Sequence, residues 1–455
     1  MSSFLETDCA DHKIICRTGT DAMNPYRQYM YSYPHKTAYR TLTGVRLEMY
    51  ASCLSGAGHG LYLHLPFCRT KCGYCNLFSV TGQDRTQIDR YLEAAERQSG
   101  QYEQILAPYR SRFSEVVIGG GTPLLLEEEQ LERMFRMLER HFSYTDEREL
   151  VIETSPGETS RTKLEILKQA GVTRVSMGIQ SFSDEELHTL KRKHSAQKAR
   201  KALALMKEYA FPCVNVDFIY GIPGQTADSV LNSLKEAVAF EPEEIFLYPL
   251  YIKHGAGLQK EMKKGMVLQP GEALLQYREA SAYLRAEGFR QDSMRRFVRS
   301  TQGRKYTECS LGTSLALGCG GRSYLGNLHY CSPYTITREG CLAQLDRFIH
   351  MEDFAQITHG IVLSEEELKR RYVIRHLLIR PGLCLSGYRE LFGTCVEEDF
   401  PILKDWKIKG YVCTDDTFLT LTETGLELSD DLGPRLISRE ISEKMEEWEH
   451  RNGQI

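Results

Sequence analysis

The sequence predicts an α/β protein organised around a parallel sheet, and three observations support this prediction. Short apolar runs alternate with helix-length segments from residue 61 to about residue 250. Each strand–helix repeat spans about 30 residues, which is the length of a βαβ unit. Glycine-rich or polar stretches follow the apolar runs, as is typical of loops that bind ligands. Right-handed crossovers between such units give a parallel sheet, either as an open barrel or as a doubly wound sheet.

Six apolar runs are predicted as the strands of this sheet. They occupy residues 61–66, 115–118, 149–153, 174–179, 214–219 and 244–250. Between them, apolar residues at i, i+3, i+4 and i+7 of segment 131–138 share one helical face. Ser183 with Glu186 has the pattern of a capping box, and Ser195 is expected to begin another helix. The crossovers between the strands are therefore predicted to be helical.

The pattern changes after residue 260. A helix is expected over 271–287, and a later strand enters the glycine-rich turn at 318–321. Ser364 is expected to cap a further helix, and a strand pair is predicted within 411–421. We expect an N-terminal arm over 1–58, the parallel-sheet domain with an extension over 59–350, and a small α+β domain with a tail over 355–455.

The N-terminal arm contains a segment, residues 24–42, that is rich in tyrosine and in basic residues. One interpretation is an extended arm on the surface of the main domain. The other is a flap over a binding site, in which Lys36 and its basic neighbours would attract an anionic substrate. The sequence leaves both interpretations open.

The bulk composition excludes several classes of protein. The chain has 57 basic and 61 acidic residues, so its net charge of −4 gives no bias toward nucleic acid or an anionic membrane. No apolar run is long enough for a membrane-spanning helix, and residues 1–20 lack the apolar core of a secretory signal. The 14 cysteines of so long a chain are typical of reduced thiols, which predicts a cytoplasmic location.

The C-terminal domain is predicted to have an acidic surface, which does not favour nucleic-acid binding. The residues on which this prediction depends are Glu397, Glu398, Asp399, Asp415, Asp416, Asp430 and Asp431.

Three cysteines follow the first predicted strand in a C-x3-C-x2-C pattern: Cys68, Cys72 and Cys75. Three thiolates can bind three irons of a four-iron four-sulfur (4Fe-4S) cluster, whereas a complete cage has four. The fourth iron would then be open to a ligand, as a catalytic site requires. Zinc is the alternative, but no second pair of ligands follows; Cys53 could supply a fourth thiolate.

Further candidate residues lie where the other predicted strands end. The sequence GGGTP, residues 119–123, follows the second strand, and Glu153 ends the third. Gln180 ends the fourth strand and Asp217 lies in the fifth. Each has a simpler explanation, as a turn, a helix cap or a sheet edge. Because the carboxyl ends of parallel strands meet at one edge, we expect one large site around the cysteine loop.

With these motifs, the chain resembles the radical S-adenosylmethionine (SAM) superfamily, and within it the oxygen-independent coproporphyrinogen III oxidase-like branch, which includes heme chaperone relatives. The motifs are Y-x-H-x-P-F-C-x3-C-x-Y-C, G-G-G-T-P, S-x-G-x-Q-S-F, R-x-H and D-x-I-Y-G-x-P-G-Q-T. The resemblance implies an open (β/α)6 partial TIM barrel with a winged-helix-like α+β C-terminal domain.

The resemblance also implies a ligand for each motif. Cys68, Cys72 and Cys75 would bind the 4Fe-4S cluster, with SAM on its free iron. The SAM contacts would come from Tyr62, Tyr74, Gly120, Gly121, Thr122 and Glu153, and a second SAM would lie against Gln180, Arg192 and Asp217. Two positions depart from the family pattern. Leu77 replaces a fourth cysteine of the oxidases, and Lys191 replaces the glycine before R-x-H.

The implied activity is cleavage of SAM to a 5′-deoxyadenosyl radical, which removes hydrogen from a porphyrin-related or other organic substrate. An electron donor such as flavodoxin or ferredoxin would supply the electron. Two alternatives share the family: a heme-binding chaperone, which the absence of the fourth cysteine favours, and a C-methyltransferase that uses two SAM molecules. No nucleic-acid partner is expected.

Overall fold

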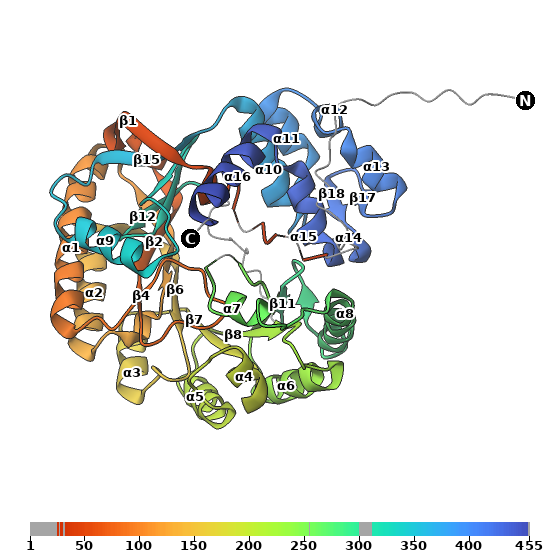
Figure 1. Cartoon of the computed structure of the whole chain (residues 1–455). Coiled ribbons are helices and arrows are strands. Elements are labelled where there is room, and N and C mark those ends of the chain that lie inside the picture. The colour runs from red at the N-terminus through yellow and green to blue at the C-terminus, as the bar shows by residue number, and fades with distance from the viewer. Residues whose placement is uncertain (1–24, 27, 31, 254, 300–311, 454–455) are drawn as a thin grey trace, which may run out of the picture.

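The fold is an open barrel of parallel strands surrounded by helices (Figure 1). The computed structural model describes residues 25, 26, 28–30, 32–253, 255–299 and 312–453. Six parallel strands pair in chain order: β2 (Ala57–Leu65), β5 (Arg112–Gly120), β6 (Ser143–Thr154), β7 (Arg174–Gln180), β8 (Cys213–Tyr220) and β9 (Glu244–Pro249). Because β2 and β9 pair with other strands and not with each other, the barrel stays open. The predicted α/β class is confirmed.

Helices between the strands cover the outer face of the sheet (Figure 1). They are α1 (Arg85–Leu106), α2 (Glu128–His141), α3 (Arg161–Gln169), α4 (Asp184–Thr189), α5 (Ala196–Glu208), α6 (Ala227–Ala239) and α8 (Pro270–Ala286). Their apolar faces bury one large core against the strands. As predicted, α4 and α5 begin after Ser183 and Ser195, whose hydroxyl oxygens accept backbone N–H groups of the first turn.

The capping box predicted at Ser183 forms only in part. The Ser183 hydroxyl accepts the N–H of Glu186, but the Glu186 carboxylate accepts from Ser181 and Gln225 instead of returning to the cap. Both partners lie near the carboxyl ends of β7 and β8. Glu186 therefore connects helix α4 to the loops that border the sheet edge.

Both edges of the barrel are extended. Strand β12 (Ser314–Leu317) runs parallel to β2. Beyond it the sheet continues antiparallel through β13 (Arg322–Leu325), β14 (Leu328–Cys331), β15 (Gln356–Val362) and β1 (Arg40–Arg46), and past β9 through β11 (Arg296–Val298) and β10 (Arg290–Gln291). Strand β1 comes from the predicted arm and β15 from the predicted C-terminal range, so we propose that both belong to the main domain.

The C-terminal part has its own apolar core and a three-stranded antiparallel sheet. The sheet consists of β16 (Leu383–Cys384), β18 (Phe418–Leu421) and β17 (Val412–Thr414). The helices are α10 (Glu365–Leu377), α11 (Leu385–Phe392), α12 (Val396–Asp399), α13 (Ile402–Ile408), α14 (Glu423–Glu427), α15 (Ser429–Leu432) and α16 (Arg439–Gly453), with α9 (Arg338–Ile349) preceding β15. Ser364 caps α10 as predicted.

The described part of the arm lies between the barrel and the C-terminal helices. Tyr33 and Tyr39 are buried in the C-terminal core, and the Tyr33 hydroxyl donates to Glu367 of α10. Tyr26 instead packs into the core of the barrel. Tyr26, Tyr33 and Tyr39 are thus interior groups, the first in the core of the barrel and the other two in the C-terminal core.

The prediction of an acidic C-terminal surface is wrong for Asp430. This residue is 1% exposed, and its carboxylate pairs with the buried guanidinium of Arg295 from the barrel. Arg295 also stacks on the ring of Tyr29, 3.8 Å from the ring centroid. A carboxylate can be buried when a cation and hydrogen bonds compensate it. Asp430 therefore belongs to the interface between the two cores.

Candidate functional site

A cavity of about 760 Å³ lies at the carboxyl ends of the parallel strands. Apart from Tyr62, every residue predicted for the cluster and SAM lines it: Cys68, Cys72, Cys75, Tyr74, Gly120, Gly121, Thr122, Glu153, Gln180, Arg192 and Asp217. Their functional roles stay predictions. Their gathering in one cavity agrees with the expectation that strand ends converge on a single site.

The cysteine loop is anchored to the barrel by backbone hydrogen bonds. Its first residues form β3 (Phe67–Cys68), which pairs with β4 (Val80–Thr81). In the middle of the loop, the Gly73 N–H donates to the carbonyl of Leu190, and the Gly73 carbonyl accepts from Leu258 at 2.7 Å. A Cβ on Gly73 would lie 2.8 Å from the Leu258 side chain. Glycine at this position therefore lets the loop pack closely on the segments after α4 and β9.

The three thiols line the wall of the cavity together. Among the described residues, no three His, Cys, Asp or Glu side chains converge on one metal-ion position. A 4Fe-4S cluster does not require such convergence, because each thiolate binds a different iron. Burial raises the pKa of Cys68 to about 11, so cluster binding would have to displace its proton. Cys53 lies beside Gly326, and it does not line the cavity.

The GGGTP segment forms the carboxyl end of β5 and the turn that follows it, and it lies against the start of the cysteine loop. Gly121 N–H donates to the Leu65 carbonyl at 2.7 Å, and Thr122 N–H donates to the Phe67 carbonyl at 2.8 Å. Gly120 has φ +118°, a conformation that favours glycine. A Cβ on Gly121 would lie 2.4 Å from the Phe67 carbonyl oxygen. The glycines thus bring the backbone of β5 directly against the residue before Cys68.

The R-x-H motif folds back onto the end of β7. Arg192 donates to the carbonyl of Gly178 and lies 3.1 Å from the Cys72 sulfur, whereas His194 contacts the carbonyl of Ile179 at 3.2 Å. Burial lowers the pKa of Arg192, but Tyr74 and the neighbouring cysteines Cys72 and Cys75 outweigh it, so the pKa lies above its ordinary value. Arg192 therefore points into the site and is not part of a solvated charged face. Its guanidinium lies beside the Cys72 sulfur of the cysteine loop.

Glu153 and Asp217 place two carboxyl groups in the cavity. The Glu153 carboxylate accepts the N–H of Gly120 at 3.1 Å, and Asp217 accepts from the Asn215 amide at 2.9 Å. Burial raises the pKa of Glu153 to about 7 and that of Asp217 to about 6, although these hydrogen bonds lower both. Each carboxyl group can therefore bind a hydroxyl or an ammonium group, and its charge changes near neutral pH.

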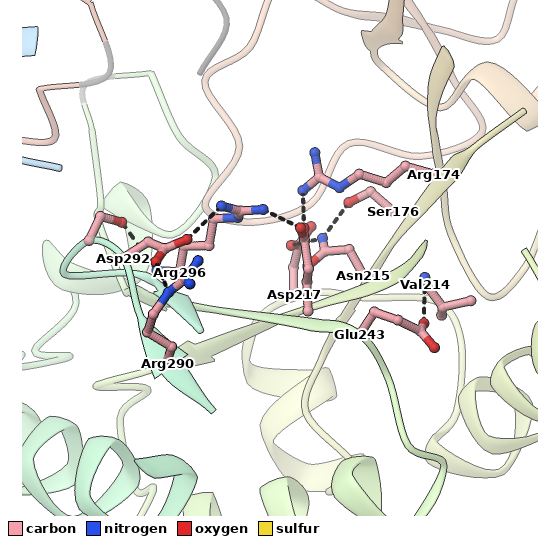
Figure 2. Close-up of polar contacts among 11 residues, drawn as sticks. Arg174, Ser176, Val214, Asn215, Asp217, Glu243, Arg290, Asp292 and Arg296 are labelled. Carbon is pink, nitrogen blue, oxygen red and sulfur yellow. Dashed lines mark hydrogen bonds and ion pairs between the residues drawn. The ribbon is translucent and has the colours of Figure 1, made fainter. Parts of the chain in front are cut away.

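A chain of buried charges that the sequence analysis missed lies beside Asp217 (Figure 2). Arg174, which begins β7, pairs with Glu244 at 2.7 Å, and Glu244 also pairs with Arg296. Arg296 continues the chain to Asp292 at 2.8 Å. Positive charge on Arg174 lowers the pKa of Asp217 and so supports its ionised form. A charged residue at the start of each of two apolar strands was the available signal.

Tyr62 lines a second, smaller cavity, which we call the inner cavity. Its hydroxyl contacts His64 Nδ1 at 3.1 Å, and His64 Nε2 lies 2.9 Å from the carbonyl of Phe78. With both ring nitrogens occupied and 4% exposure, His64 is a buried core histidine. Gly120 and Glu153 line both cavities. Tyr62 lines only the inner cavity, and these two residues lie between it and the main cavity.

The raised pKa of Glu153 predicts a pH-dependent cost of folding. Below its ordinary pKa of 4.5 the carboxyl group is protonated in both states, and stability is unaffected. As pH rises toward about 7, the unfolded chain ionises first, so stability falls and the full cost remains above that pH. Glu153→Gln should therefore stabilise cluster-free protein by roughly 1–3 kcal/mol at about pH 8 and by little at about pH 4.5.

Urea denaturation of wild type and Glu153→Gln at both pH values measures this difference. Glu132→Gln, on the exposed face of α2, is the control and should change little at either pH. An equal effect of Glu153→Gln at both pH values would contradict the proposed cost of ionisation.

Comparison with known proteins shows what this chain is similar to. The model of the radical SAM superfamily matches residues 62–237. The heme chaperone HemW of Bacillus subtilis is 27% identical over 82% of this chain and 97% of its own length. The oxygen-independent coproporphyrinogen III oxidase of Escherichia coli is 25% identical over 80% of this chain and 82% of its own length.

A solved structure shares the fold. The coproporphyrinogen III oxidase HemN from Escherichia coli superimposes with a TM-score of 0.77 at 23% identity. The match covers 90% of this chain and 96% of that one, so it includes both the barrel and the C-terminal part. Among the described residues, no helix is long and apolar enough to cross a bilayer.

Proposed function

We propose that this chain is a radical SAM enzyme that acts on a porphyrin-related or other organic substrate. The proposal is supported by the match to the radical SAM model and by the relatives named HemW and oxygen-independent coproporphyrinogen III oxidase. The observation that supports this most directly is the position of Cys68, Cys72 and Cys75 at the wall of the main cavity, facing glycines and carboxyls of three strands. A bound 4Fe-4S cluster would supply the electron that splits the sulfonium of SAM into methionine and a 5′-deoxyadenosyl radical.

The residues of the chain would bind and orient SAM. The backbone of Gly120 and Gly121 allows a ligand to approach the edge of β5 without a Cβ in the way. Glu153 offers a carboxylate to the ribose hydroxyls or the methionyl ammonium, and Tyr74 offers an aromatic face. Arg192 would hold negative charge near Cys72.

The test is SAM cleavage by anaerobically reconstituted protein. With dithionite as the electron source, 5′-deoxyadenosine should accumulate and can be quantified by liquid chromatography. Flavodoxin or ferredoxin should replace dithionite if either is the natural donor. S-adenosylhomocysteine among the products would instead support the methyltransferase with a second SAM against Gln180, Arg192 and Asp217. Iron-loaded protein that leaves SAM intact would contradict the enzyme proposal.

A second candidate is a heme-binding chaperone of the same family. Two observations favour it: the match to a HemW protein extends over nearly all of that protein, and Leu77 stands in the place of the fourth cysteine of the oxidases. Titration of heme into the reconstituted protein separates the two candidates. A stoichiometric shift of the heme absorption band without substrate turnover supports the chaperone, and no shift contradicts it.

A further inference from the structure

Tyr334, in the loop between β14 and α9, contacts the cysteine loop from 258 positions away in the chain. Its hydroxyl donates to the backbone carbonyl of Asn76 at 3.1 Å. Asn76 directly follows Cys75, the last of the three cysteines. The hydroxyl of Tyr334 therefore fixes the carbonyl of the peptide bond that joins Asn76 to Leu77.

The N–H of the same peptide bond belongs to Leu77 and serves Cys75. Burial raises the pKa of the Cys75 thiol, although a backbone hydrogen bond from Leu77 lowers it. The Leu77 N–H therefore donates to the Cys75 sulfur. The peptide bond is trans and planar, so its carbonyl and its N–H point in opposite directions. One rigid group thus joins the Tyr334 hydroxyl on one side to the Cys75 sulfur on the other.

Two distant segments hold the ring of Tyr334. The indole of Trp448, from the C-terminal helix α16, stacks on it with 5.0 Å between the ring centroids. From the arm, the His35 imidazole meets the ring edge-on at 6.3 Å, and the Lys36 ammonium lies 3.8 Å from its centroid. Aromatic and cation–π contacts of this kind restrict how a ring can turn. The arm and α16 therefore fix the direction in which the Tyr334 hydroxyl points.

Hydrogen bonds to the sulfurs are among the features that set the reduction potential of an iron–sulfur cluster. They stabilise the additional negative charge of the reduced state. A hydroxyl that donates to the Asn76 carbonyl polarises the peptide group, and this polarisation makes the Leu77 N–H a stronger donor to Cys75. Residues that orient and polarise the ligands of a metal centre in this way tune it without touching it.

We propose that Tyr334 is a positioning residue that raises the reduction potential of the cluster through the peptide group between Asn76 and Leu77. The inference rests on the proposed function, because it requires that Cys75 binds the cluster. Its consequence is that the protein accepts an electron from a weaker reductant than it would without the Tyr334 hydroxyl. The role of Trp448 and Lys36 is to keep the ring of Tyr334 in place.

Tyr334→Phe removes the hydroxyl and keeps the ring contacts. In a redox titration of reconstituted protein without SAM, followed by electron paramagnetic resonance, the midpoint potential should become more negative. At a fixed solution potential the ratio of reduced to oxidised cluster should fall roughly two- to tenfold, the effect of one weakened hydrogen bond. Iron and sulfide content should match wild type.

Tyr144→Phe is the matched control. The Tyr144 hydroxyl also donates to a backbone carbonyl, that of Leu138 at 2.8 Å, but it lies where strand β6 begins, at the opposite end of the barrel from the cysteine loop. Its removal should leave the midpoint potential unchanged.

A second change at the same position tests the direction of the effect. 3-Fluorotyrosine in place of Tyr334 keeps the shape and has a more acidic hydroxyl, so at neutral pH the midpoint potential should become more positive than in wild type. Loss of packing would not produce opposite shifts in the two proteins. The fluorotyrosine protein also decides the question if Tyr334→Phe assembles too little cluster for a titration.

Trp448→Leu tests the support of the ring. It should shift the potential in the same direction as Tyr334→Phe. Added to Tyr334→Phe, it should cause no further shift, because Trp448 acts through the Tyr334 hydroxyl.

An unchanged potential in Tyr334→Phe with full iron content would overturn the role of Tyr334, as would shifts of the same sign for phenylalanine and 3-fluorotyrosine. A shifted potential in a protein that leaves SAM intact would contradict the proposed enzyme alone. SAM cleavage with an unshifted potential would contradict the role of Tyr334 alone. A chain that assembles no cluster would contradict both.

Discussion

Replacing Cys72 with alanine is expected to reduce 5′-deoxyadenosine formation to background. Cys72 lies between the other two cysteines of the loop, and its sulfur contacts the guanidinium of Arg192. A cluster bound by three cysteines has one thiolate on each of three irons. Without the Cys72 thiolate, only two irons keep a protein ligand, and the cluster should not be retained. The variant should therefore also lose iron and acid-labile sulfide. Both are measured on anaerobically reconstituted protein, with circular dichroism to confirm the fold.

Cys53→Ala is the matched control for Cys72→Ala. Cys53 packs near Gly326, away from the main cavity, so its removal should leave iron content and SAM cleavage at wild-type levels. A Cys72→Ala protein that retains its iron and its SAM cleavage would show that the loop cysteines do not bind the catalytic cluster. Loss of activity in Cys53→Ala would instead support the alternative in which Cys53 supplies a fourth thiolate.

Replacing Gly121 with alanine is expected to prevent cluster assembly although no ligand is touched. The new Cβ would lie 2.4 Å from the Phe67 carbonyl oxygen and 2.8 Å from its carbon, and these backbone atoms cannot rotate away. Relief requires β5 to separate from the start of the cysteine loop, which breaks the hydrogen bonds of Gly121 to Leu65 and of Thr122 to Phe67. We expect a loss of about 1–3 kcal/mol in stability and a large loss of iron content.

Gly157→Ala tests whether this effect is specific. Gly157 lines the same cavity, but a Cβ there would meet no atom within 4 Å. Iron content and denaturation midpoint should therefore match wild type. If Gly121→Ala incorporates iron as well as Gly157→Ala does, the close approach of β5 to the cysteine loop is not needed to hold the cluster.

Most of the barrel could be predicted from local sequence patterns. Each of the six predicted strands overlaps an observed strand, because a buried parallel strand requires a short continuous apolar run. Ser183, Ser195 and Ser364 cap the expected helices, since the bond from a serine hydroxyl to the first turn involves only neighbouring residues. The residues of the main cavity could be identified for the same reason, because they follow strands whose ends must meet.

What local patterns could not predict depends on pairs of residues far apart in the chain. Asp430 looked like a surface acid until Arg295 was seen to bury it. The contact of Arg192 with Cys72 joins residues that are 120 positions apart. Lys36 of the arm and Arg322 line the same cavity, although almost 300 residues separate them in the chain. The division of the site into a main and an inner cavity likewise depends on side chains from separate strands.

By itself, the sequence determined the α/β class, the places of the strands along the chain and the set of residues at their ends. These follow from hydrophobic periodicity, helix caps and glycine turns, each of which involves a few neighbouring residues. Only the tertiary structure decided which charges are buried against each other and where Tyr62, Lys36 and Arg322 lie. The physical reason is that the cost of burying a charge depends on its partners in space, and a linear sequence does not state those partners.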